Sequence, residues 1–166
     1  MHFMTTVKDI HRHEANDDHD KSLGVLFNPQ SVAIIGASDD TSRIGGRSIL
    51  YLKNYGFLGS IYPVNLNRAH ILGFLAYSSV ELIPGEVSLA IVALPANAVL
   101  EAVRACARKG VKVVIIFSAG FAESHEDGAA QQAELVEVAR AANVRLLGPN
   151  CLGAFNLHTG FVGTFS

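Results

Sequence analysis

The chain has few cysteines and no long apolar run. Its 166 residues include only Cys106 and Cys151, too few for a disulfide scaffold. No uninterrupted apolar run reaches the about 20 residues of a transmembrane helix. The start also lacks the basic segment and apolar core of a secretory signal. We therefore expect a cytoplasmic protein in a reducing environment, with no membrane partner.

Positive charge is not in excess either. Lysine and arginine number 13 against 15 acidic residues, which gives a net charge of −2. Binding to nucleic acid needs a basic surface, so no nucleic-acid partner is expected. A polyanionic ligand would have to be held by a few placed cations and by backbone donors. With 49% apolar and 17% charged residues, the chain is long enough for one domain with a packed core.

Residues 1–21 differ from the rest because they show little periodic apolar pattern. Four histidines lie there among five acidic residues. A metal site requires a framework that holds its ligands, and this segment offers none. We expect a flexible polar N-terminal extension over 1–21, no metal site, and a folded domain over 22–166.

Strand and helix patterns alternate from residue 31 onward. Short apolar runs bounded by turn residues are typical of buried strands, and longer amphipathic stretches are typical of helices. Strands are predicted at 31–35, 60–64, 88–93, 111–117 and 145–147, and helices at 44–55, 96–109 and 124–142. This alternation predicts an α/β fold, Rossmann-like and doubly wound, with a mainly parallel sheet and helices on both faces.

The carboxyl ends of the predicted strands are the expected ligand site. Right-handed crossovers bring these ends to one edge of a parallel sheet, where ligands bind. The segments that follow the strands are small, polar or turn-forming, as a ligand crevice requires: 36–38, 65–68, 94–96, 118–120 and 148–150.

The first of these segments indicates a phosphate-bearing ligand. The strand 31–35 stops at Gly36-Ala37-Ser38, and a helix follows through Gly45-Gly46. A strand, a small-residue turn and a helix direct backbone N–H groups and the positive end of the helix dipole at an anion. The second glycine of the dinucleotide fingerprint is replaced by Ser38. The loop thus indicates phosphate more strongly than it indicates NAD.

Two arginines bear on the identity of that ligand. Arg43 lies near the predicted helix start, where a cation is unfavourable unless solvent or an anion compensates it. Arg68 follows the strand 60–64, and no acidic residue occurs between Ser60 and Val80. A dehydrogenase has a carboxylate at this place for the ribose hydroxyls, whereas an arginine accommodates a ribose phosphate. This argues against NAD and for a ligand with a phosphate on its adenosine ribose.

The later strand ends carry further candidates but no catalytic group. Ser118-Ala119-Gly120 would let a ligand approach the backbone, and Asn150 can tie adjacent loops together by side-chain hydrogen bonds. Cys151 has no identifiable base to activate it, so a structural thiol is expected.

Four segments together resemble the CoA-binding domain of the NDP-forming acyl-CoA synthetases. This superfamily includes the ADP-forming acetate–CoA ligases and the succinyl-CoA synthetase alpha subunit. The resemblance covers about residues 26–165, and its order and spacing make it specific. The segments are LFNPQSVAIIGAS (26–38), GSIYPVN (59–65), SAGFAE (118–123) and LGPNCLG (147–153).

The resemblance implies roles for particular residues in binding CoA or acyl-CoA. Arg68 would meet the nucleotide phosphates. We expect Arg43, Asn65 and Asn150 in the same site, from their positions at the helix start and the strand ends. The phosphates would be wrapped by the loop that begins Gly36, Ala37, Ser38, Asp39. Pro95 and Ala96 would flank the adenine, and Phe117, Ser118 and Ala119 would line the pantetheine path. The acidic stretch Asp39-Asp40 departs from the family pattern, because it places negative charge where an anion should sit.

The resemblance also implies a reaction. Such synthetases convert acyl-CoA, phosphate and NDP into acid, CoA and NTP through an acyl-phosphate and an enzyme phosphohistidine. The phosphohistidine and ATP-grasp domains would be partners outside this chain, which alone would not be catalytic. One alternative is a regulatory CoA-sensing domain of a protein acetyltransferase. Another is an NAD-binding Rossmann module, which Ser38 and Arg68 disfavour.

Overall fold

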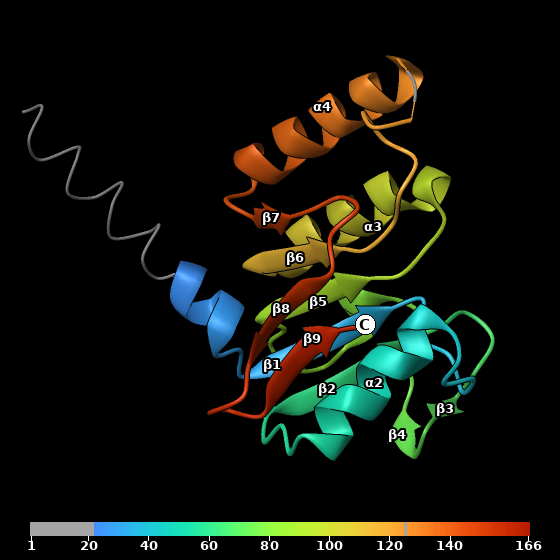
Figure 1. The fold of residues 1–166 in the computed structure, drawn as a ribbon, viewed down its shortest axis with the longest axis vertical. Helices are drawn as coiled ribbons and strands as arrows, with labels where there is room; N and C mark the ends of the chain where they lie inside the picture. Colours follow the sequence, from blue (N-terminus) through green and yellow to red (C-terminus); the bar gives the residue numbers. More distant parts are fainter. Residues whose placement is uncertain (1–21, 125) are drawn as a thin grey trace, which may run out of the picture.

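Apolar segments from five places in the chain form one parallel sheet. The computed structural model describes residues 22–124 and 126–166, so the predicted extension 1–21 lies outside the described residues. The sheet has the order β2-β1-β5-β6-β7, and every neighbouring pair is parallel (Figure 1). The strands are β1 Ser31–Ile35, β2 Ser60–Val64, β5 Leu89–Val92, β6 Val113–Ile116 and β7 Arg145–Leu147. All five predicted strands are confirmed.

The helices connect these strands and cover the sheet. Helix α2 spans Ile44–Asn54, α3 spans Ala96–Lys109 and α4 spans Glu126–Ala141. Residues 22–27 are also helical, and Val80–Leu82 form the 3-10 turn η1. The predicted doubly wound, Rossmann-like α/β fold is confirmed.

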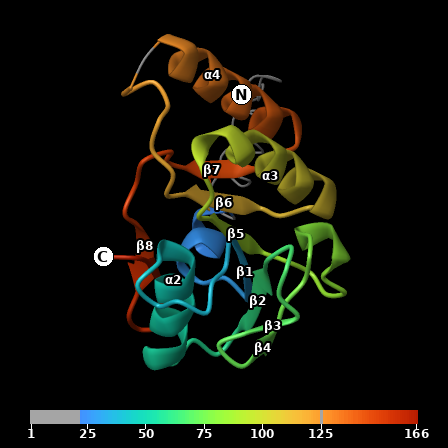
Figure 2. The same cartoon turned by 90° about the vertical axis from the view of Figure 1, so that its right-hand side faces the viewer.

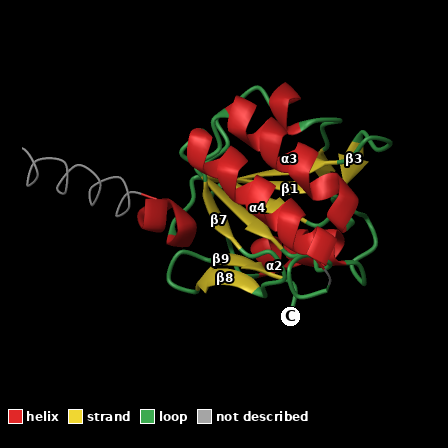
Figure 3. Ribbon diagram, turned by 90° about the horizontal axis from the view of Figure 1, so that it is seen from above, coloured by secondary structure: helices red, strands yellow, loops and turns green. Residues whose placement is uncertain are grey.

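Side-chain alternation along the strands divides the core into two layers. Because successive residues of a strand face opposite ways, Val32 and Ile34 of β1 pack with Ile49 and Leu52 of α2. Ala33 and Ile35 face the opposite layer, which contains Val99 and Val103 of α3 and Leu135 of α4. Figure 3 shows α2 on one side of the sheet and α3 on the other.

A β-hairpin completes the α2 side, and the sequence pattern did not predict it. Strands β8 Gly153–Asn156 and β9 Phe161–Thr164 pair antiparallel and lie beside α2 (Figure 1). Ala154 and Phe161 join the same core layer as α2. Each strand has four residues, one of them glycine, so the sequence shows no alternation of apolar and polar residues there. The hairpin is held in place by its packing in this core layer.

A second hairpin lies beyond the edge strand β2. The strands β3 His70–Ile71 and β4 Phe74–Leu75 pair antiparallel, and β4 packs beside β2 (Figure 2). The turn between them contains Leu72 and Gly73, both with positive φ (50° and 89°). None of the helices in residues 22–124 and 126–166 is long and apolar enough to cross a membrane.

Glycines bring α2 close to the end of β1. A Cβ at Gly36 would lie 2.3 Å from the Ala93 carbonyl oxygen, and one at Gly45 would lie 2.1 Å from the Gly36 carbonyl oxygen. Gly36 also has φ +90°, a conformation that side chains rarely adopt. The glycine turn is therefore required by the packing of β1, β5 and α2, independently of any ligand.

Candidate functional site

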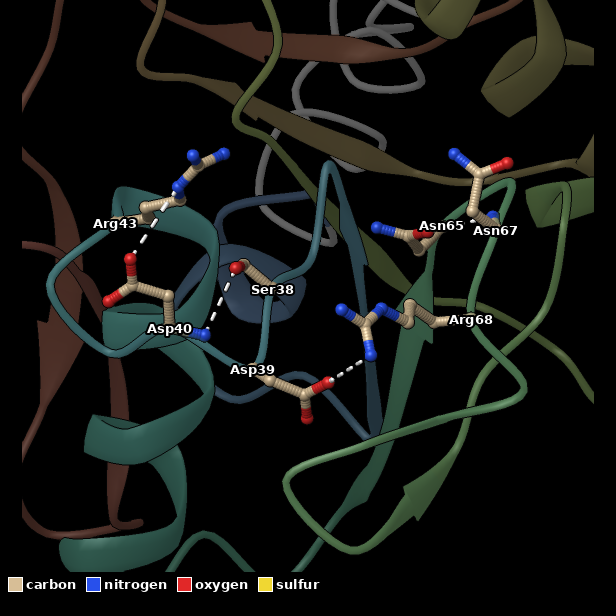
Figure 4. A pocket seen from close by; sticks show the side chains of 7 residues that line it. All are labelled: Ser38, Asp39, Asp40, Arg43, Asn65, Asn67 and Arg68. Carbon is tan, nitrogen blue, oxygen red and sulfur yellow. Dashed lines mark hydrogen bonds and ion pairs between the residues drawn. The ribbon is translucent and has the colours of Figure 1, made fainter.

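A hollow opens between the carboxyl ends of β1 and β2 (Figure 4). Its volume is about 500 Å³. The loop from β1 to α2 forms one wall, and the segment after β2 forms the other. Seven residues line it: Ser38, Asp39, Asp40, Arg43, Asn65, Asn67 and Arg68. Five of them were predicted from the sequence. Asp40 and Asn67 were missed as site residues, although each stands next to a predicted one.

The amides of the glycine turn are partly occupied by the fold. The backbone N–H groups of Gly36 and Ala37 both donate to the Val64 carbonyl oxygen, at 3.1 and 3.2 Å. Further along, the Asp40 N–H donates to Ser38 Oγ at 3.1 Å. Gly36 and Ala37 therefore offer a ligand close approach to the backbone but not these two N–H donors. The Ser38 hydroxyl retains its own proton for donation.

Asn65 joins the two walls of the hollow. Its side-chain Nδ2 donates to the Ala37 carbonyl oxygen at 2.8 Å, and its Oδ1 accepts from the Asn67 N–H at 2.8 Å. This hydrogen bond, from the backbone N–H two residues on to the Asn65 side chain, forms an Asx turn. Asn65 thus holds the loops in register.

Each arginine of the hollow faces an aspartate. Arg43 Nε lies 3.6 Å from Asp40 Oδ2, and Arg68 Nη1 lies 3.7 Å from Asp39 Oδ2. Asp40 Oδ1 also accepts from the Ser42 hydroxyl (2.6 Å) and the Ser42 N–H (2.9 Å). The Ser42 hydrogen bonds, followed by the charge of Arg43, lower the pKa of Asp40. Both acidic side chains are therefore engaged with protein groups.

Arg47 was not among the predicted site residues, yet it supports the loop. It lies in the first turns of α2 and donates from Nη2 to the Ser42 carbonyl oxygen at 2.9 Å. From Nη1 it donates to the Phe165 carbonyl oxygen at 3.1 Å. Arg47 thereby connects the loop before α2 with the segment that follows β9, a contact that sequence spacing gives no hint of.

Other predicted residues lie at the ends of β5, β6 and β7, outside the lining of the hollow. The Ser118 hydroxyl donates to the Leu94 carbonyl oxygen, and the Asn150 N–H donates to the Ser118 carbonyl oxygen at 2.9 Å. Asn150 thus connects adjacent loops through its backbone N–H, whereas side-chain hydrogen bonds were predicted. Pro95 precedes α3 and Ala96 is its first residue. Ala119, in the segment after β6, is exposed.

Phe117 is a predicted site residue whose side chain is buried. It is 4% exposed, and its ring meets that of Phe165 edge to face, with centroids 4.8 Å apart. This ring belongs to the core layer beneath the sheet edge. The Phe117 side chain therefore packs in the core at the carboxyl end of β6 and does not line the hollow.

Neither a reactive thiol nor a metal cluster adds chemistry to the site. The half-buried Cys151 thiol contacts the carbonyl oxygens of Ile116 and Leu147, both at 3.4 Å, and burial raises its pKa. It is therefore a neutral, structural thiol at pH 7. Within residues 22–124 and 126–166, no three His, Cys, Asp or Glu side chains are grouped to hold a metal ion.

Comparison with known proteins connects this geometry to a family. Residues 30–156 match the CoA-binding domain family. The chain is 43% identical over 143 residues to the alpha subunit of the ADP-forming acetate–CoA ligase II of Pyrococcus furiosus, and the match covers 86% of this chain and 31% of that subunit. It is 43% identical over 141 residues to the ADP-forming acetate–CoA ligase II of Archaeoglobus fulgidus, of which it spans 21%.

Solved structures agree with these relatives. A dinucleotide-forming acetyl-coenzyme A synthetase of Ca. Korarchaeum cryptofilum, solved with phosphate and ADP, superposes with a TM-score of 0.83 at 34% identity. The superposition covers 86% of this chain and 30% of that one. This chain thus spans about a third or less of the length of each of these relatives. The chain belongs to the CoA-binding domain family, in the form found in ADP-forming acetate–CoA ligases.

Proposed function

We propose that this domain binds CoA or acyl-CoA for an NDP-forming acyl-CoA synthetase. The single observation that carries the proposal is the placement of Arg68 in the hollow between β1 and β2. A guanidinium presents several N–H donors in a planar fork that matches a phosphate. CoA has a phosphate on its adenosine ribose, and NAD does not.

The electrostatics of the hollow support CoA over NAD. A dehydrogenase places a carboxylate at the end of the second strand to accept from the ribose hydroxyls. Here β2 is followed by Asn65, whose side chain is bonded to protein on both sides, and then by Arg68. The nearby carboxylates of Asp39 and Asp40 come from the other wall and face cations. The part of the hollow beside Arg68, where the adenosine ribose would lie, is thus suited to a phosphate on that ribose.

The remaining ligand would follow the sheet edge. The pyrophosphate would lie against Ser38 and Arg43 at the start of α2, where the helix dipole favours an anion. The adenine would lie beside Pro95 and Ala96, and the pantetheine arm beside Ser118 and Ala119, with Phe117 beneath. This course crosses the point where the strand order reverses, between β1 and β5, which is where such sheets bind ligands.

The chemistry would be completed elsewhere in the synthetase. In the proposed reaction, acyl-CoA, phosphate and NDP give acid, CoA and NTP, with phosphoryl transfer through a histidine of a further domain and an ATP-grasp domain for the nucleotide. The described histidines, His70 and His158, are exposed on hairpins, and we assign neither to the phosphoryl carrier. Cys106 and Cys151 are free thiols, in keeping with a cytoplasmic location.

Titration calorimetry of the chain with CoA, dephospho-CoA and NAD tests the proposal. We expect CoA to bind, dephospho-CoA to bind more weakly, and NAD to give no heat at the same concentrations. Binding of NAD without binding of CoA would overturn the proposal. Equal affinity for CoA and dephospho-CoA would leave CoA binding intact but remove the role of Arg68.

A further inference from the structure

Asp39 is the residue that the family resemblance explains least, because it puts a negative charge beside the proposed phosphate site. Its carboxylate has two different partners. Oδ1 accepts from the Leu72 N–H at 3.0 Å, and Oδ2 lies 3.7 Å from Arg68 Nη1. Leu72 belongs to the turn of the β3–β4 hairpin. One side chain thus connects the glycine loop, this hairpin and the arginine of the hollow.

Arg68 needs such a partner to be placed. Its side chain is 65% exposed, and it follows a strand end on a segment of exposed residues. Within the described part of the chain, its guanidinium makes no hydrogen bond that would fix it. In Figure 4 it extends from the β2 side across the hollow toward the loop that carries Ser38, with Asp39 beside it. A long free arginine loses rotamer entropy when it binds an anion, and a prior partner reduces that cost.

We propose that Asp39 is a positioning residue that presents Arg68 to the ribose phosphate and so sets the discrimination between CoA and dephospho-CoA. This inference rests on the proposed function. The 3.7 Å separation leaves the N–H donors of Arg68 available for a ligand, while the carboxylate fixes the direction of the guanidinium. The hydrogen bond to Leu72 in turn fixes the carboxylate.

The experiment measures the ratio of the CoA and dephospho-CoA affinities by calorimetry in matched variants. Asp39→Ala removes both contacts, whereas Asp39→Asn keeps an acceptor for Leu72 and loses the charge. We expect both variants to lower the ratio by up to about fivefold, the range of an exposed ion pair. In an Arg68→Ala background, Asp39→Ala should not change the ratio further, because the two residues act as one unit.

Glu86→Gln is the charge-matched control, because this exposed glutamate precedes β5 at the amino end of the sheet, away from the hollow. We expect it to leave the ratio unchanged. An increase of the ratio in the Asp39 variants would mean that Asp39 repels the phosphate, and would overturn the inference. A ratio retained in Asp39→Asn would assign the effect to the Leu72 contact and overturn the role of the ion pair. If wild type prefers CoA and no Asp39 variant changes that preference, only this inference fails; if wild type does not bind CoA, the proposed function fails.

Discussion

The side-chain amide of Asn65 donates a 2.8 Å hydrogen bond to the carbonyl oxygen of Ala37, across the carboxyl ends of β1 and β2. The two residues are 28 positions apart in the chain. Ala37 is buried, and Asn65 is half-buried. This bond fixes the distance between the glycine loop and the segment that carries Arg68, and hence the width of the proposed phosphate site.

Replacing Asn65 should therefore affect both stability and binding. In Asn65→Ala the Ala37 carbonyl oxygen loses its donor, which costs about 1–3 kcal/mol for a buried polar group. We expect a lower free energy of unfolding in urea and weaker binding of CoA. Asn67→Ala is the control, because the bond from its backbone N–H to Asn65 survives the substitution. Equal stability of the two variants would contradict this prediction.

The glycines of the domain offer a second, purely structural test. Gly45→Ala would place a Cβ 2.1 Å from the Gly36 carbonyl oxygen, and we expect a loss of about 1–3 kcal/mol through overpacking. Gly24→Ala is the matched control: Gly24 also lies in a helical segment, but its Cβ would meet nothing within 4 Å. There the alanine should stabilise by up to about 1 kcal/mol. Thermal and urea unfolding of the two variants should thus shift in opposite directions.

An ion-pair cluster at α3 predicts a pH dependence. Arg108 lies 2.9 Å from Glu81 and 3.0 Å from Glu101, and its hydrogen bond lowers the pKa of Glu81 from the ordinary 4.5. A lowered carboxyl pKa contributes stability above the unfolded-state value, and this contribution is lost as pH falls through the folded-state value. We expect Arg108→Ala to be slightly less stable than wild type at pH 7.

The difference should shrink as the pH falls below about 4.5, where Glu81 becomes protonated in the unfolded state and then in the folded state. Urea unfolding at pH 7 and at acidic pH measures it, and added salt at pH 7 should also reduce it. A difference that grows on acidification would mean that the cluster does not act through the Glu81 carboxylate.

Local sequence patterns predicted the sheet and its helices closely. The ranges for β1, β2 and α3 coincide with the structure, because apolar runs bounded by glycine and proline leave little freedom in where these elements end. The hairpin β8–β9 was missed, because its strands have no alternation of their own. The family resemblance of the segments was confirmed by the comparisons, although it did not indicate how the side chains of the hollow are paired.

The sequence by itself determined the fold class and the family, and it predicted the edge of the sheet at which we propose that a ligand binds. The fold class and the predicted edge follow from local composition and from the fixed handedness of strand–helix crossovers, and the family follows from the resemblance of four segments. Neither needs knowledge of particular contacts. Only the tertiary structure decided that Asn65 reaches Ala37, that Asp39 joins Arg68 to the β3–β4 hairpin, and that the Gly36 and Ala37 amides are bonded to Val64. Such contacts join positions 27 or more residues apart, and they depend on how two loops approach once the sheet has brought their ends together.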